Sequence, residues 1–305
     1  MQRITLSVGA VCISIALSGP SCSGRPGFNA QRSFADLVAQ CEFGPRVPNS
    51  EAHTRAADFL FNSLKSTTDL TRRQQFTYFD SLTGETLRLM NLIASYNPEN
   101  LRRVMLCAHW DSRPHSDMEP DSSKRHLPVL GANDGASGVA ILLELGRLFH
   151  ESPPPVGVDI VLFDGEDYGL SGAQSGWLIG SEYFAANMGS YRPRFAILID
   201  MVGDSDLQIY REKYSQQYAA DINDYIWGIA RENNVGAFED SVKHTVYDDH
   251  VSLLSDRIKA IDIIDFDYPH WHTQADTPDK CSPQSLATVG EVLLAAIYNK
   301  AVEKF

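Results

Sequence analysis

Short apolar runs that alternate with helical patterns are the strongest constraint on the fold of this chain. The runs are rich in β-branched residues and lie at residues 104–111, 158–165, 195–203 and 260–266, with helical patterns between them at residues 134–150, 177–188 and 217–233. Strands that alternate with helices form a largely parallel sheet with helices on both faces. Burial on both faces also explains why these runs are apolar throughout instead of alternating with polar residues.

Further elements flank this alternating core. The spacing of apolar residues after a Pro-Asn-Ser start predicts a helix over residues 50–65, and a long helical pattern fills residues 284–303. Residues 72–80 and 87–96 flank a G-E-T turn, which predicts an antiparallel hairpin. Neither an internal repeat nor a long linker interrupts the sequence, and 43% of the residues are hydrophobic, enough for a large core. We therefore predict an α/β protein in which residues 23–305 form a single globular domain, with a mixed, mostly parallel central sheet flanked by helices on both faces.

Residues 1–22 have the layout of an export signal. Arg3 precedes an apolar stretch that ends in small residues and a cysteine. The stretch is too short and too rich in serine for a transmembrane helix. Cys22 is either the lipidated first residue of a bacterial lipoprotein, anchored to the membrane, or close to a simple cleavage site, because the preceding G-P-S matches a lipidation box poorly. The chain is expected to be exported, either to the periplasm or as a membrane-anchored lipoprotein.

Cysteine usage limits the number of disulfides, and the net charge limits the kinds of partner. Cys12 and Cys22 belong to the leader, so Cys41, Cys107 and Cys281 can form at most one disulfide. Cys107 lies in an apolar strand and is expected to be a buried thiol, whereas Cys41 and Cys281 could pair if their geometry allows it. The formal net charge is -13 with no run of Lys or Arg, which argues against a nucleic-acid partner.

Acids and histidines gather where the predicted strands end. In open α/β sheets, ligands bind outside the carboxyl ends of the strands, so these side chains should meet at one rim. The strand-end residues are His109, Asp111, Glu166, Asp167, Asp200, His270 and His272, and Asp134 starts the helix between the first two strands.

Each of these residues also has an ordinary structural interpretation. Asp134 could be a helix N-cap, Asp200 a turn residue, and Glu166 with Asp167 a solvated turn. Together they are harder to explain, because several carboxylates in one cleft repel each other unless a cation or a shared proton neutralises them. One histidine and two acids leave an open coordination position, which is typical of catalytic zinc. Asp164, earlier in the same F-D-G-E-D stretch, is expected to be structural and to bond backbone amides of its loop.

The motifs resemble those of the M28 zinc aminopeptidase superfamily, and more closely those of its glutaminyl-peptide cyclotransferase branch, the glutaminyl cyclases. The matching stretches occur in family order over roughly residues 40–300. They are H-W-D-S at 109–112, G-A-N-D-G-A-S-G-V-A at 131–140, F-D-G-E-D at 163–167, G-S-E-Y-F at 180–184, L-I-D-M-V-G at 198–203, D-D-H at 248–250 and W-H-T-Q-A-D-T at 271–277.

The resemblance implies a zinc-dependent enzyme that converts N-terminal glutaminyl residues of peptides to pyroglutamate and releases ammonia. It implies one zinc ion per chain, held by Asp134, Asp167 and His272. The remaining roles it implies are Glu166 as general acid/base, Asp200 and Asp248 as its hydrogen-bonding partners, and Trp271 as the aromatic wall of the substrate pocket. The expected partners are peptide or protein N-termini that bear glutamine, and the chain is expected to be a monomer.

A dinuclear aminopeptidase uses much of the same set of residues and is the alternative. By the same resemblance, His109 and Asp200 would bind a second zinc, Asp134 would be shared, and Glu166 would activate water. Several assignments stay open. Asp249 could replace Asp248, His250 could cap a helix at residues 250–257, Trp271 could be a core aromatic, and Asp111 and His270 could be supporting or surface residues.

One position departs from the family pattern. The family usually has Glu-Glu where this chain has Glu166-Asp167. Aspartate is one methylene shorter than glutamate, so the metal or the local backbone must lie closer for Asp167 to bind. Neighbouring residues at a strand end point in opposite directions, so one of the pair can reach the metal and the other the substrate.

Overall fold

The computed structural model describes residues 25–305. The predicted export signal at residues 1–22, with Cys12 and Cys22, lies outside the described residues, and so does the question of lipidation. Cys41, Cys107 and Cys281 are all buried, and no disulfide joins any two of them within residues 25–305, so the Cys41–Cys281 pair is not formed. The expectation of a buried thiol at Cys107 is confirmed.

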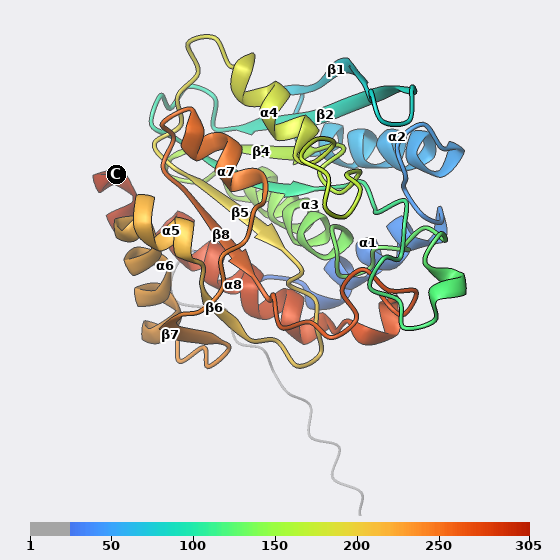
Figure 1. Cartoon of the computed structure of the whole chain (residues 1–305). Helices are drawn as coiled ribbons and strands as arrows, with labels where there is room; N and C mark the ends of the chain where they lie inside the picture. The colour runs from blue at the N-terminus through green and yellow to red at the C-terminus, as the bar shows by residue number, and fades with distance from the viewer. Residues whose placement is uncertain (1–24) are drawn as a thin grey trace, which may run out of the picture.

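A six-stranded sheet in the order β1-β2-β4-β3-β5-β8 forms the centre of the molecule (Figure 1). Its strands are β1 (Thr71–Phe79), β2 (Thr86–Tyr96), β3 (Arg103–His109), β4 (Gly157–Phe163), β5 (Ala196–Asp200) and β8 (Ala260–Ile264). The strands β4, β3, β5 and β8 pair in parallel, whereas β1 with β2 and β2 with β4 pair antiparallel. The predicted mixed, mostly parallel sheet is therefore confirmed.

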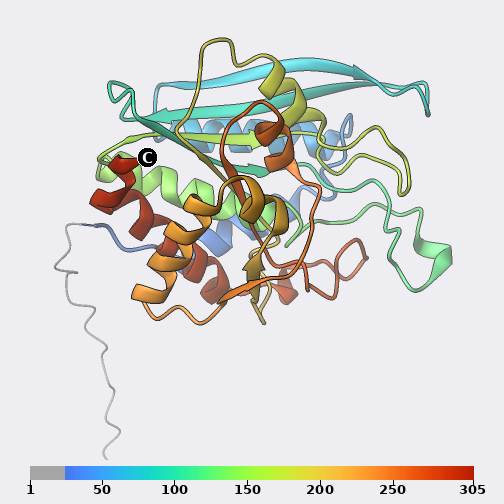
Figure 2. The ribbon, with the colours of Figure 1, turned by 60° about the vertical axis from the view of Figure 1, so that its left-hand side comes forward.

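Helices cover both faces of the sheet (Figures 1 and 2). The larger core cluster packs one face against α1 (Ala30–Glu42), α2 (Glu51–Lys65), α3 (Ala136–Glu151), α6 (Ala220–Glu232) and α8 (Pro283–Tyr298). A smaller cluster packs the other face against α4 (Ile179–Ala186) and α7 (Asp249–Ser255). The short helix α5 (Lys213–Tyr218) contacts β8, and 3-10 turns form η1 (Ser122–Lys124), η2 (Pro278–Lys280) and η3 (Lys300–Lys304). One α/β domain accounts for the described residues.

The structure differs from the sequence prediction in a few elements. Helix α1 and a separate two-stranded parallel sheet of β6 (Ile209–Arg211) and β7 (Phe238–Val242) were not predicted. The helix predicted over residues 217–233 is two helices, because Ala219 leaves the helical conformation at φ -142° and ψ 39°. The strand predicted over residues 195–203 ends at Asp200, because Met201 has a positive φ of 47° that a strand cannot continue through.

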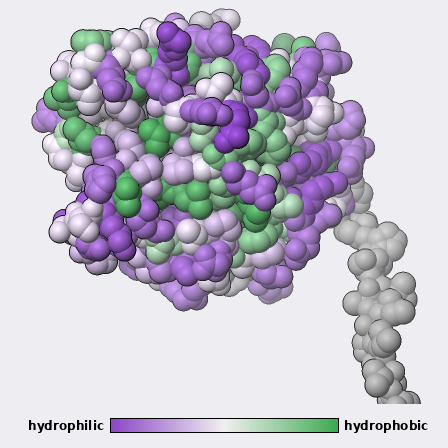
Figure 3. All heavy atoms as spheres, turned by 90° about the vertical axis from the view of Figure 1, so that its right-hand side faces the viewer, coloured by the Kyte–Doolittle hydropathy of each residue, from purple (hydrophilic) through white to green (hydrophobic). Residues whose placement is uncertain are grey.

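One face of the molecule is mainly hydrophilic. Figure 3 shows one face of the molecule, on which apolar side chains are interspersed among hydrophilic ones. Between residues 25 and 305, no helix has the length and apolar character needed to cross a bilayer.

Candidate active site and metal centre

A cavity of about 560 Å³ opens at the carboxyl ends of the parallel strands. It is lined by all seven residues predicted for the site: Asp134, Glu166, Asp167, Asp200, Asp248, Trp271 and His272. They come from five separate segments of the chain: Asp200 ends β5, and the others follow β3, β4, β7 and β8. The rim expected from the strand endings therefore exists, and it gathers these side chains around one space.

The loop that carries Asp134 is fixed by its backbone. Helix α3 begins at Ala136, its N-cap residue is Gly135 with a φ of 81°, and no side chain caps it. The carboxylate of Asp276 accepts hydrogen bonds from the backbone N–H groups of Asn133 (2.8 Å) and Asp134 (3.2 Å). Asp134 is therefore not the helix N-cap, and its side chain is free to face the cavity.

Asp134, Asp167 and His272 form one group of side chains that could hold a metal ion. His272 Nε2 lies 3.4 Å from Asp167 Oδ1 and 3.7 Å from Asp134 Oδ2. A tetrahedral zinc ion with bonds of about 2.0–2.1 Å places its ligand atoms roughly 3.3 Å apart. Asp167 Oδ2 is buried and has no hydrogen-bond partner among residues 25–305. Two carboxylates and one imidazole, with one buried carboxylate oxygen left without a partner, fit a bound zinc ion.

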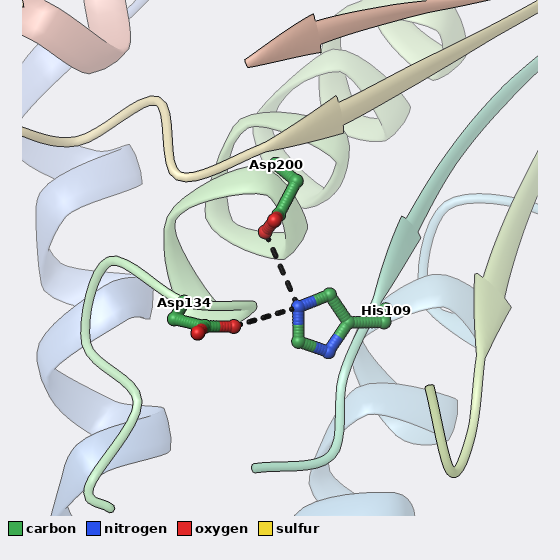
Figure 4. A group of neighbouring side chains, drawn as sticks. All are labelled: His109, Asp134 and Asp200. Carbon is green, nitrogen blue, oxygen red and sulfur yellow. Dashed lines mark hydrogen bonds and ion pairs between the residues drawn. The ribbon is translucent and has the colours of Figure 1, made fainter. Parts of the chain in front are cut away.

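A second group consists of His109, Asp134 and Asp200 (Figure 4). His109 Nε2 lies 3.1 Å from Asp134 Oδ1 and 3.2 Å from Asp200 Oδ1. Burial alone would lower the pKa of His109, but Asp200, Asp111 and Asp134 together raise that pKa well above its usual value. Either a second metal ion or a proton on His109 can therefore neutralise these carboxylates.

The loop of Glu166 and Asp167 is held by Asp111. The backbone N–H groups of Glu166 and Asp167 donate to the Asp111 carboxylate at 3.1 and 3.3 Å. Asp111 is fully buried, so it supports the site and is not a surface residue. Both side chains of the pair can then project into the cavity from one fixed backbone segment.

Asp164 is structural, as expected, but its partners differ from those predicted. Its carboxylate pairs with His53 Nε2 at 2.8 Å and accepts from the backbone N–H of Met90 at 2.7 Å. These contacts join the end of β4 to α2 and β2. The amides of the loop itself are bonded by Asp111 instead.

Carboxylates crowd together around Glu166. Burial and the charge of Asp248 raise the pKa of Glu166 well above its usual value. Burial and the charge of Asp200 raise the pKa of Asp248 to about 7. Burial also raises the pKa of Asp200, although His109 opposes that shift. A carboxyl group whose pKa is raised toward neutrality is better able both to take and to give a proton at physiological pH.

The contacts of Asp248, Asp249 and His250 show which residue of the D-D-H stretch faces the cavity. Asp248 lines the cavity and is the N-cap residue of α7, whereas Asp249 is fully buried and is not part of the cavity wall. His250 Nε2 pairs with Glu212 at 3.2 Å, so His250 does not cap the helix. Asp248 is therefore the acid of this stretch that can reach a bound molecule.

Aromatic side chains form part of the cavity wall. The ring of Trp271 stacks on that of His272 with centroids 3.9 Å apart, and Phe266 lies 5.1 Å from Trp271. Trp271 is only partly buried, so it is not an ordinary core aromatic. Trp177 also lines the cavity and was not predicted, whereas His270 is not part of the wall.

Two charged residues close to the potential metal ligands were missed by the sequence analysis. Arg113 Nη1 donates to Asp167 Oδ1 at 2.7 Å, and Asp117 Oδ1 lies 3.1 Å from His272 Nδ1. Arg113 directly follows the H-W-D-S motif, which is the only sequence signal for it. Asp117 stands in a loop without a motif, so nothing in the sequence marks it.

A mostly parallel sheet with acids and histidines at the carboxyl ends of its strands is typical of α/β proteins that bind a ligand at this rim. The chain belongs to peptidase family M28, whose model matches residues 91–297. The resemblance drawn from the motifs is therefore confirmed at the level of the family.

Several solved structures are similar to this chain over most of its length. The chain is 38% identical to a glutaminyl cyclase from Bacteroides thetaiotaomicron bound to N-acetylhistamine, with a TM-score of 0.87 over 90% of this chain and 99% of that one. It is 39% identical to a Tannerella forsythia glutaminyl cyclase, with a TM-score of 0.86 over 90% of this chain and 100% of that one. A Bacteroides thetaiotaomicron protein described as a leucine aminopeptidase precursor is also similar, at 38% identity and a TM-score of 0.87 over 90% and 98%.

Proposed function

We propose that this chain is a zinc-dependent glutaminyl-peptide cyclotransferase. The observation that carries the proposal is the wall formed by Trp271, which stacks on His272 in the cavity that also contains Glu166. An aromatic surface beside the metal ligands suits a short aliphatic side chain folded back on itself. The similarity to two glutaminyl cyclases over 90% of the chain supports the same function.

Asp134, Asp167 and His272 would hold the zinc ion. When bound, zinc supplies Lewis acidity that polarises the side-chain carbonyl of the glutaminyl residue. Three protein ligands are the number typical of a zinc site that also takes part in catalysis. One zinc ion per chain is the stoichiometry that this proposal requires.

Glu166 would move the proton of the reaction. The neutral α-amine nitrogen of the substrate bonds to its own side-chain amide carbon, and the bond from that carbon to the amide nitrogen breaks. Glu166 takes a proton from the attacking amine and gives it to the departing nitrogen, which leaves as ammonia. The raised pKa of Glu166 suits both transfers, and Asp200 and Asp248 would share protons with it.

Trp271 would bind the substrate. Its ring can pack on the two methylene groups of the glutaminyl side chain and hold them in the folded shape that ring closure needs. Positioning of this kind removes much of the entropic cost of an intramolecular attack.

A dinuclear aminopeptidase is the second candidate. One specific feature favours it, because the two groups of potential metal ligands share Asp134. In that case His109 and Asp200 would hold a second zinc ion, and Glu166 would activate a water molecule. The similarity to a protein described as a leucine aminopeptidase precursor points the same way.

Mass spectrometry of a peptide with an N-terminal glutamine distinguishes the two functions. After incubation with the protein, loss of ammonia from the intact peptide supports the cyclotransferase. Release of the free N-terminal amino acid supports the aminopeptidase instead and overturns the proposal. A peptide that begins with glutamate serves as the matched control, because its carboxylate has no ammonia to release.

We also propose that the protein is exported from the cell, on the basis of the layout of residues 1–22. Fractionation of cells that express the full chain tests this, and the protein is expected outside the cytoplasm. Cys22→Ser separates the two routes. It abolishes membrane association if Cys22 is lipidated and leaves the distribution unchanged after simple cleavage.

A further inference from the structure

We propose that Arg113 and Asp117 form a clamp that positions two zinc ligands, Asp167 and His272, and so sets the affinity of the site for zinc. The inference rests on the zinc site of the proposed function. It goes beyond that function because it assigns a role to two residues outside the ligand set. Both are positioning residues, since neither would bind the metal.

The guanidinium of Arg113 joins two acids. It is 1% exposed, and its Nε and Nη2 donate to Asp117 Oδ1 and Oδ2 at 2.9 and 2.6 Å. Its Nη1 donates to Asp167 Oδ1 at 2.7 Å and to the Asp167 carbonyl at 3.2 Å. Arginine can make this set of contacts because its donors lie in one rigid plane, whereas lysine presents a single ammonium.

Asp117 extends the clamp to His272. Its Oδ1 lies 3.1 Å from His272 Nδ1, so Nδ1–H can donate to the carboxylate. A proton held on Nδ1 leaves the lone pair on Nε2, the atom that faces Asp134 and Asp167. Carboxylates that hold a ligating histidine in this way fix its ring orientation and make it a stronger ligand.

The clamp also explains how an aspartate can serve at position 167. A shorter side chain needs a fixed backbone and a fixed rotamer to reach the metal. Arg113 supplies both restraints, because it holds the carbonyl and one carboxylate oxygen of the same residue. The other oxygen, Oδ2, is buried without a partner.

The position of Arg113 is restrained from a further side. Its guanidinium lies over the ring of Trp177, 4.7 Å from the centroid. Trp177 lines the cavity, so one buried cation contacts a proposed zinc ligand, the carboxylate behind another, and the wall of the pocket. A buried arginine with its donors committed to two carboxylates has little freedom to move.

Zinc affinity tests the clamp without reference to turnover. Asp117→Asn keeps the shape of the side chain but removes its charge, and it is expected to raise the zinc dissociation constant about 10–100-fold in a chelator competition. Arg113→Lys keeps the positive charge and loses the planar fork, so it should change the constant in the same direction. The double variant should lose less zinc-binding free energy than the two single variants lose in sum, because both residues act through one set of contacts.

Cobalt provides a spectroscopic readout of ligand geometry. The cobalt-substituted Asp117→Asn and Arg113→Lys variants are expected to show altered visible absorption bands, which a role in folding alone would not produce. Arg103→Lys is the matched control, because Arg103 pairs with Asp159 through Nε and Nη2 at 2.7 Å each, near the amino ends of β3 and β4 and away from the cavity. It should lower the stability of the fold and leave zinc affinity unchanged.

Unchanged zinc affinity and unchanged cobalt bands in Asp117→Asn would overturn the proposal. If Arg113→Lys does not fold, the isosteric Asp117→Asn variant decides the question alone. Because both readouts follow metal binding, they stand even if the peptide assay shows no cyclisation.

Discussion

His109 and His272 direct their Nε2 atoms to different oxygens of one carboxylate. His109 Nε2 lies 3.1 Å from Asp134 Oδ1, and His272 Nε2 lies 3.7 Å from Asp134 Oδ2. Asp134 is thus common to two groups of potential metal ligands, which makes the number of bound metal ions the most direct test of the function.

Metal analysis is expected to find about one zinc ion per chain. One ion is the number that the cyclotransferase requires, because a proton on His109, whose pKa the neighbouring carboxylates raise, can neutralise them without a second metal. The measurement is elemental analysis of the purified protein after dialysis against metal-free buffer. A stoichiometry near two would favour the dinuclear aminopeptidase.

Glu166→Gln is expected to lower kcat by about 10²–10⁴-fold, the usual contribution of a general acid–base group. Glutamine fills the same space but cannot transfer the proton, and it leaves Asp134, Asp167 and His272 in place. Zinc content should therefore be unchanged. Glu182→Gln, on the exposed side of α4, is the control and should keep its turnover. Near-full activity of Glu166→Gln would remove the assigned role.

Trp271→Ala is expected to raise KM about tenfold or more. The burial of one apolar side chain contributes roughly 1.5–3 kcal/mol, and the variant removes the surface against which the substrate side chain would be buried. Trp271→Phe keeps an aromatic surface and should lie between the alanine variant and the parent. Steady-state kinetics on a glutaminyl peptide measures both. An unchanged KM in Trp271→Ala would place the substrate elsewhere in the cavity.

Glu212 should make the stability of the protein sensitive to acid. Burial alone would raise the pKa of Glu212, but His250 and the backbone N–H groups of Ser215 and Tyr214 lower that pKa to about 2 from an unperturbed 4.5. A depressed pKa contributes stability above the unfolded-state pKa, and this contribution is lost as the pH falls from about 4.5 toward 2.

Glu212→Gln is therefore expected to cost about 2 kcal/mol of unfolding free energy at pH 7, and progressively less at acidic pH. Urea unfolding of both proteins across this pH range gives the comparison. A difference that is the same at pH 7 and at pH 2 would contradict the assignment.

The sequence predicted the elements whose patterns are long and periodic. The four parallel strands and α3 were found because their apolar runs are buried throughout. Strand β7 was missed because four of its five residues are exposed, which leaves no pattern to detect. The ends of β5 and α5 coincide with single residues, Met201 and Ala219, whose backbone conformations the apolar pattern does not reveal.

The candidate site was predicted to the extent that strand endings and motifs mark it. The predicted residues line one cavity, because parallel strands bring their carboxyl ends together. The residues that support them were not predicted, since Arg113 meets Asp167 across 54 positions of sequence. Asp111 was left between a supporting and a surface position, because the sequence does not show which amides its carboxylate meets.

Two hydrogen bonds to Asp111 hold the backbone of Glu166 and Asp167, so the two side chains can be substituted independently. The course of the loop is restrained by Asp111 through two backbone N–H groups and by Arg113 through the carbonyl of Asp167. The length of the carboxylate at 167 can therefore be exchanged without displacing the one at 166. Asp167→Glu is therefore expected to change the affinity for zinc while it leaves the backbone position of Glu166 unchanged.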